Sequence, residues 1–183
     1  IRTSRVFRDT TAWYHILCVK NTTAVAAADR TKIYINGELA ELYGLPPNYA
    51  SSGYALYAGN GHRAAVGGSS KTGTPSPVYD GNFDGYISEV QFINGTALGP
   101  EYFGRFKEGL WIAKPSYKDQ GGSYGTNGFY LSGNITAGTD TSGNSLSFAQ
   151  LNQRGAGTID LVPDTPENNF CLLYTSPSPR DIG

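Results

Sequence analysis

Residues 32–41 read KIYINGELAE and carry the best hairpin signal in the chain. Ile33 and Ile35 alternate with polar neighbours, as in a strand with one buried face. Asn36 and Gly37 follow, a residue pair that readily adopts the two positive φ angles of a type I′ turn. The stretch therefore predicts a β-hairpin whose turn lies at Asn36-Gly37.

Stretches on both sides of this hairpin also have the texture of strands. Residues 13–20 (WYHILCVK) are aromatic and aliphatic, which predicts a buried core strand. Residues 83–93 (FDGYISEVQFI) change the phase of their apolar positions, which predicts a central, buried strand with a bulge near Ser88-Glu89 and Phe83 in the core. Shorter strands are expected at 54–58, 63–66 and 158–162.

The composition agrees with many short strands joined by tight turns. The chain of 183 residues contains 24 Gly, 10 Pro and 13 Tyr, and only 16% of its residues are charged. Pro100 follows Gly99 at a favourable first helical position, so a helix of one or two turns is expected before Gly109. No helical stretch is long enough for a parallel βαβ crossover, and the expected fold class is all-β.

The charge balance argues against two classes of partner. The formal net charge is −1, which provides no basic field for phosphates, so neither nucleic acid nor an anionic membrane surface is expected to bind. No apolar run approaches the roughly 20 residues that span a bilayer.

The texture of the sequence predicts how the chain is divided. Residues 1–114 are expected to form one domain, 115–127 a linker rich in Gly, Ser and Tyr, and 128–170 the start of a second, similar module. The chain contains no Met and begins with Ile in a strand-like run, so the first domain is expected to lack its N-terminal strands.

The order of motifs in residues 5–170 resembles the second half of concanavalin A-like, laminin-G-like domains. The motifs share a strand-and-turn texture: Ala12-Trp13-Tyr14-His15, Lys32 to Gly37, Phe83 to Phe92, and Asn94 to Leu98. The continuation, at 125–131, 140–144 and 164–170, is similar to linkers and module starts of marine phage structural proteins. The resemblance implies a two-sheet antiparallel jelly-roll sandwich, N-terminally truncated, in a virion tail fibre or appendage.

Residues 171–183 have a different character. Cys171 to Asp181 reads CLLYTSPSPRD and resembles the conceptual translation of a sequencing-library adapter. The segment is interpreted as an artefact that belongs neither to the fold nor to the functional part of the protein.

Residues 80–85 (DGNFDG) match the opening of a calcium loop, with Asp or Asn at alternate positions and a glycine where the chain must turn. The twelfth position is Gln91, so the bidentate carboxylate of such a loop is missing. No metal site and no cofactor are predicted, although the family resemblance leaves calcium open. Residues 59–64 and 68–72 are similar to nucleotide-binding loops but lack the helix that would follow, and are interpreted as turns.

The sequence offers no signature of catalysis, and we expect a protein that is not an enzyme. Its two histidines, His15 and His62, lie in a strand-like run and a glycine-rich turn. Laminarinase-type glycosidases place carboxylates at alternating positions of one strand, and no Glu-x-Asp-x-x-Glu run occurs here. Asp84 and Glu89 are separated by an odd number of positions, so they would face opposite sides of a regular strand.

The expected function is binding of host surface carbohydrate by a virion module that also contacts other virion structural proteins and is extracellular in the assembled particle. Aromatic residues in loops rich in Gly and Ser provide flat platforms for sugars, and short polar side chains fix the orientation. The expected carbohydrate-binding residues are Tyr49, Tyr54, Tyr79, Asp80 and Asn82. A structural virion module without a ligand is the alternative, and a laminarinase-type glycoside hydrolase is the third.

Overall fold

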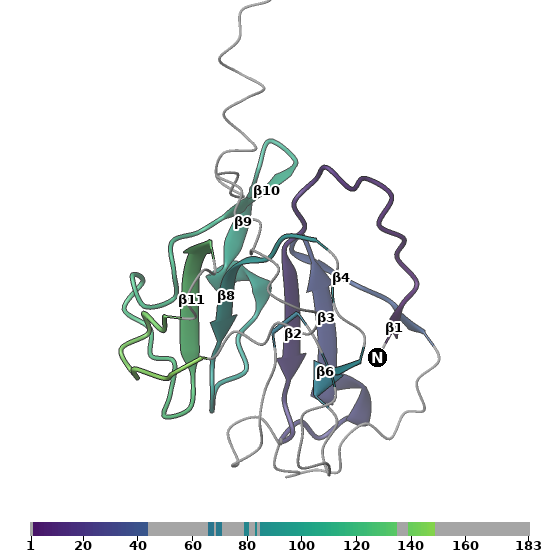
Figure 1. Ribbon diagram of the computed structural model, residues 1–183. Coiled ribbons are helices and arrows are strands. Elements are labelled where there is room, and N and C mark those ends of the chain that lie inside the picture. Colours follow the sequence, from purple (N-terminus) through teal and green to yellow (C-terminus); the bar gives the residue numbers. More distant parts are fainter. Residues whose placement is uncertain are drawn as a thin grey trace, which may run out of the picture. The chain divides into compact units, whose positions relative to one another are not determined.

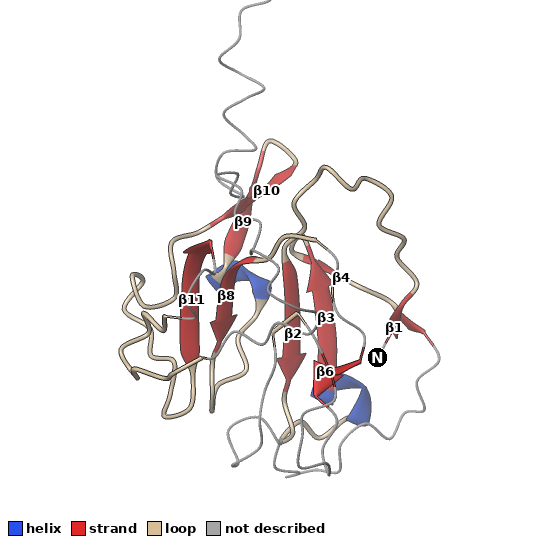
Figure 2. Cartoon of the chain, viewed as in Figure 1, coloured by secondary structure: helices blue, strands red, loops and turns tan. Residues whose placement is uncertain are grey.

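The computed structural model describes residues 2–43, 66–67, 69–70, 79–80, 83, 85–134 and 139–148 (Figure 1). Strands dominate these residues, every pairing between them is antiparallel, and the only helical segments described are two short 3₁₀ turns (Figure 2). The expectation of an all-β chain is confirmed. The expected strands at 54–58 and 158–162, and all of 63–66 except Val66, lie outside the described residues.

The chain forms two compact units. The first contains the described residues up to Tyr43 together with Gly95–Gly122. The second contains the described residues of Ala55–Asn94 and of Ser123–Pro163. Each unit therefore joins segments that are distant in sequence.

The first unit contains a three-stranded sheet in the order β2-β3-β4. These strands are β2 (Ile16–Lys20), β3 (Thr31–Ile35) and β4 (Glu38–Leu39). Ile35 pairs with Glu38 across the turn, where Asn36 has φ 50° and Gly37 has φ 78°. The hairpin predicted from KIYINGELAE is confirmed, and both turn residues have the positive φ angles of a type I′ turn.

The strand expected at 13–20 is shorter and less buried than predicted. It begins at Ile16, which pairs with Ile35, and the Ile16 side chain is 61% exposed. Cys18 is also exposed, whereas Leu17 and Val19 on the opposite face are half-buried. The prediction of a buried core strand is therefore wrong for the face that carries Ile16 and Cys18, because no described side chain covers it.

Two small elements complete this part of the unit. The strands β1 (Arg2–Thr3) and β5 (Leu42–Tyr43) pair with each other. A 3₁₀ turn, η1 (Ala27–Arg30), leads directly into β3.

Of the helix of one or two turns expected at Pro100, before Gly109, the structure contains a single turn. A 3₁₀ turn, η2 (Pro100–Tyr102), is followed by β9 (Gly104–Lys107) and β10 (Leu110–Ala113), which pair as a hairpin. Glu108 at φ 52° and Gly109 at φ 79° form its two-residue turn. The glycine accommodates the left-handed backbone, and the pairing of the two strands outweighs the helical preference of the Pro-Glu start.

Trp111 packs against the backbone of two glycines in the first unit. A Cβ atom added at Gly37, in the β3–β4 turn, would overlap the six-membered ring of the indole. A Cβ atom at Gly104, on β9, would overlap the indole at other atoms, Cε2, Cζ2 and Nε1. The indole thereby links the β3–β4 turn to the β9–β10 hairpin, and Ile35 and Phe103 are buried in the same unit.

In the second unit, β8 (Ser88–Phe92) pairs with β11 (Phe129–Asn134). Leu131 lies opposite Val90 and Asn134 lies opposite Ser88, so two residues of β11 face the single residue Glu89. The irregularity predicted near Ser88-Glu89 is confirmed, but its extra residue is on β11. Glu89 has φ 55° and Gly133 has φ 62°, so both strands adopt left-handed backbone at this point.

Two features of the strand expected at 83–93 are wrong. It begins at Ser88, and within the described residues it has only β11 as a hydrogen-bonded neighbour, so it is not central there. Phe83 was expected in the core but is 57% exposed. Gly85 lies between Phe83 and the start of β8, and its φ of 152° interrupts the extended chain there.

The core of the second unit gathers around Phe129, whose ring centroid lies 5.5 Å from that of Phe92 and 4.7 Å from that of Phe148. Tyr124 and Leu131 are buried in the same unit. A separate pair of short strands, β6 (Ser69–Ser70) and β7 (Tyr79–Asp80), belongs to it as well. β11 lies in the expected second module, 128–170, and β8 lies in the expected first domain, 1–114, but the two strands share a sheet. The division of the chain at the linker 115–127 stays a prediction.

The contact between Gly37 and Trp111 predicts unequal costs for two similar substitutions. Gly37→Ala and Gly109→Ala both put alanine at nearly the same left-handed φ, which costs about 1–2 kcal/mol. Only Gly37→Ala also forces a methyl group against the indole, which adds about 1–3 kcal/mol, because nothing lies within 4 Å of a Cβ at Gly109. Chemical denaturation of both variants measures the difference, and equal losses of stability would contradict the packing of Trp111 on Gly37.

Candidate functional site

The structure describes part of the predicted carbohydrate-binding set. Tyr79 and Asp80 form β7, where Tyr79 pairs with Ser70 and Asp80 pairs with Ser69. Tyr49, Tyr54 and Asn82 lie outside the described residues. The structure thus places the backbone of two of the five residues on one short strand, and the grouping of all five stays a prediction.

Two exposed aromatic residues follow β7 and were not predicted as site residues. Phe83 is 57% exposed and Tyr86 is 51% exposed. The backbone N–H of Phe83 donates a hydrogen bond of 2.8 Å to the carbonyl oxygen of Gly67, and the Phe83 ring lies over Gly85, within 2.9 Å of where a Cβ would stand. The sequence did contain a signal for the exposure of Phe83. Glycines at 81 and 85 predict a turn around it, and an aromatic side chain in a turn can face solvent.

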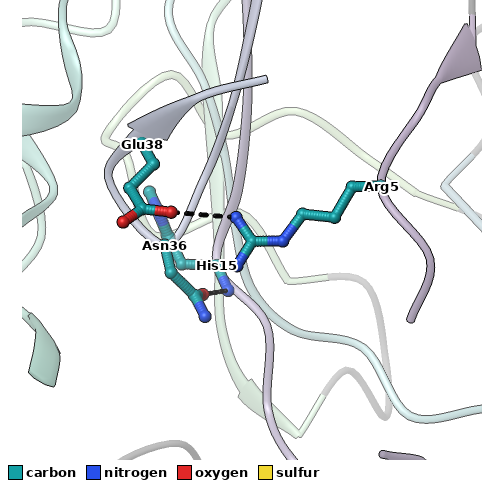
Figure 3. Close-up of polar contacts among 4 residues, drawn as sticks. All are labelled: Arg5, His15, Asn36 and Glu38. Carbon is teal, nitrogen blue, oxygen red and sulfur yellow. Dashed lines mark hydrogen bonds and ion pairs between the residues drawn. The ribbon is translucent and has the colours of Figure 1, made fainter. Parts of the chain in front are cut away.

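A polar cluster surrounds the Asn36-Gly37 turn in the first unit (Figure 3). The backbone N–H of His15 donates to Asn36 Oδ1 at 2.8 Å, and the backbone N–H of Asn36 donates to the carbonyl oxygen of His15 at 2.9 Å. Arg5 Nη1 lies 3.1 Å from Glu38 Oε2 in an ion pair on the surface. Such exposed pairs contribute about 0–1 kcal/mol, so the bonds between Asn36 and His15 fix the turn more firmly than the ion pair does.

The imidazole of His15 is packed among aromatic rings. Its centroid lies 5.7 Å from that of Trp111 and 6.2 Å from that of Phe103. Nδ1 of His15 and Nε1 of Trp111 are buried, and neither has a hydrogen-bond partner among the described residues. Burial lowers the pKa of His15 below its usual value of 6.5, so the ring is neutral at pH 7. Asn36 orients the backbone of this histidine and not its ring, and the geometry gives the imidazole a packing role.

Glu89 is held across the irregular point of the β8–β11 pair. Its carboxylate accepts hydrogen bonds from the hydroxyl of Tyr130 and from the backbone N–H of Gly133, the latter at 2.6 Å. The Tyr130 ring stacks on Tyr124, at 6.1 Å between centroids, and the Tyr124 hydroxyl donates to Gln91 Oε1 at 2.6 Å. This arrangement uses the Glu89 carboxylate to satisfy the backbone where the strand pairing breaks.

Asp140 organises the loop that follows β11. Its Oδ1 accepts the backbone N–H groups of Tyr130 and Ser142, and its Oδ2 accepts the Ser142 hydroxyl and the N–H of Leu146, at 2.9–3.0 Å. Burial raises the pKa of this carboxyl, but the hydrogen bonds from Tyr130, Leu146 and Ser142 outweigh that effect, so the pKa lies below the usual 3.8. With four donors in place, the carboxylate has a structural role.

The described residues include no group of three or more His, Cys, Asp or Glu side chains that could hold a metal ion. Of the stretch 80–85 that matches a calcium-loop opening, Gly81, Asn82 and Asp84 lie outside the description. The possibility of calcium at this stretch therefore stays as the sequence left it.

Comparison of the chain with protein-family models, with curated proteins and with solved structures found no match. No helix among the described residues is long and apolar enough to cross a membrane.

The lowered pKa of His15 predicts a pH-dependent stability. As the pH falls below about 6.5, the unfolded chain takes up this proton before the folded chain does, so the free energy of unfolding decreases. His15→Phe keeps a flat ring beside Trp111 and Phe103 but does not titrate. We therefore expect the melting temperature of this variant to rise relative to the wild type as the pH falls from about 7.5 to about 5.5.

The matched control is His62→Phe, which removes the other histidine of the chain. Thermal melts monitored by circular dichroism across the same pH range compare the two variants. A pH dependence that disappears in His62→Phe and persists in His15→Phe would show that burial of His15 is not its source.

Proposed function

We propose that the chain is a non-enzymatic carbohydrate-binding module of a phage tail fibre or appendage, built as a concanavalin A-like, two-sheet antiparallel jelly roll. The order of motifs supports this proposal, because the Lys32–Gly37 motif forms an antiparallel hairpin, as a jelly roll requires. The module would be exposed on the virion and would contact host surface glycans and other virion proteins.

The exposure of Phe83 and Tyr86, which follow β7 in the sequence, is the observation that carries the proposal. A sugar ring presents an apolar C–H face and a rim of hydroxyl groups, so its binding site needs an aromatic platform beside short polar groups. Tyr79 and Asp80 on β7 supply both chemical types next to these exposed rings in the sequence. The proposed site therefore extends the predicted set by Phe83 and Tyr86.

A single site of this kind binds weakly. A dissociation constant of about 0.1–1 mM corresponds to about −4 to −5.5 kcal/mol. Many copies on one virion raise the overall avidity by orders of magnitude without any new contact. The binding assay must therefore present the chain in multivalent form.

We predict that beads carrying many copies of the chain bind at least one bacterial surface polysaccharide. Replacing Tyr49, Tyr54 and Tyr79 together by Ala should reduce retention about tenfold or more, because the stacking platform is lost. Phe83→Ala should reduce retention as well, because Phe83 is exposed and follows Tyr79 and Asp80 closely in the sequence. An array of bacterial polysaccharides with bound protein measured by fluorescence provides the readout.

Tyr43→Ala is the matched control, since Tyr43 is 70% exposed, lies on β5 and is not one of the proposed site residues. It should leave binding unchanged. Binding that survives the triple replacement would remove the three tyrosines from the site. The absence of binding to every polysaccharide would favour a purely structural virion module.

A further inference from the structure

The pairing of β9 with β10 creates a hairpin face with an unusual composition. Lys107 lies opposite Leu110 and Arg105 lies opposite Ile112, so these four side chains project from the same side of the hairpin. We call this set the cationic face. Arg105, Lys107 and Leu110 are exposed, and Ile112 is half-buried.

The opposite side of the hairpin is held in the first unit. Phe106 and Trp111 lie opposite each other there, with ring centroids 5.1 Å apart. Trp111 in turn packs on Gly37 and Gly104. The cationic face therefore stands on a hairpin that is fixed from behind, which limits the conformational entropy that a ligand must overcome.

Within the described residues, Arg105 and Lys107 make no ion pair, in contrast to other cations of the first unit. Arg5 is paired with Glu38, Lys32 with Asp29 at 3.0 Å, and Lys114 Nζ donates to the carbonyl oxygen of Glu101 at 2.6 Å. Residues 104–114 carry Arg105, Lys107 and Lys114 but only one acid, Glu108, in the turn. A local excess of positive charge thus occurs in a chain whose net charge is −1.

We infer that the cationic face binds a linear, anionic polysaccharide. The planar guanidinium of Arg105 matches the two oxygens of a carboxylate or sulfate, and Lys107 supplies a second point charge two residues along the strand. Residues two apart on one strand lie about 6.6–6.8 Å from each other, so the two cations can meet separate charged groups of one extended polymer. Leu110 offers an apolar surface to the C–H face of a sugar between them.

The spacing of charge favours a polysaccharide over a nucleic acid. Duplex DNA carries one charge per about 1.7 Å of its axis, and proteins that bind it commonly neutralise about 6–10 phosphates. Within the part of the chain that the structure describes, the cationic face offers two cations without an ion pair, far fewer than such a protein uses. This inference goes beyond the aromatic site proposed above, since it concerns other residues and does not require that site.

The test uses the complete chain and three immobilised polymers: polygalacturonate as the carboxylate probe, heparin as the sulfate probe, and dextran as the neutral control. The chain should bind one or both anionic polymers at low salt and should not bind dextran through this face. Arg105→Gln/Lys107→Gln should weaken that binding at least tenfold and reduce its dependence on salt. Leu110→Ser should weaken it by a smaller factor.

Arg5→Gln/Lys32→Gln is the matched control, because it removes the same net charge from two cations, one exposed and one half-buried, that are already paired. It should retain binding, and circular dichroism should show that both double variants are folded. Equal losses in the two double variants would overturn the inference, since net charge alone would then explain binding. Tighter binding of a DNA oligonucleotide than of either polysaccharide, or no binding to any anionic polymer, would also overturn it.

Discussion

The indole of Trp111 rests on the backbone of Gly37, and the organisation of the first unit depends on this contact. The turn at Asn36-Gly37 presents bare backbone to the ring because its second residue has no Cβ. The same turn binds the backbone of His15 through Asn36, and the imidazole of His15 then packs beside Trp111 and Phe103. One left-handed glycine thus joins the β2–β3–β4 sheet to the β9–β10 hairpin, on whose other side the cationic face stands.

The sequence predicted the elements whose signals are local. Asn36-Gly37 is a turn pair whose residues both tolerate positive φ, so the hairpin could be located to the residue. Glu108-Gly109 forms an equivalent turn but was missed, because Glu is a good helix former and Pro100 favours a helix start. The pairing of β9 with β10 favours the hairpin turn over a helix. The residues of the turn alone do not reveal that pairing.

Residues of the candidate sites were harder to predict, because their roles depend on partners far along the chain. The change of apolar phase near Glu89 indicated an irregular strand, but only the register with β11 shows where the extra residue lies. Phe83 was expected in the core from its apolar character, yet its ring is exposed and lies over Gly85. The cationic face was not predicted at all, since Arg105 and Lys107 share a face only in a strand and no strand was expected in this segment.

Native-state hydrogen exchange on Trp111→Leu tests most directly whether one contact holds the two hairpins of the first unit together. If it does, amides of β3, such as those of Ile33 and Ile35, should lose protection together with amides of β9 and β10, although β3 is not mutated. The β8–β11 pair of the second unit should keep its protection and serves as the internal reference. Loss of protection confined to β9 and β10, with β3 unchanged, would contradict the role assigned to Trp111.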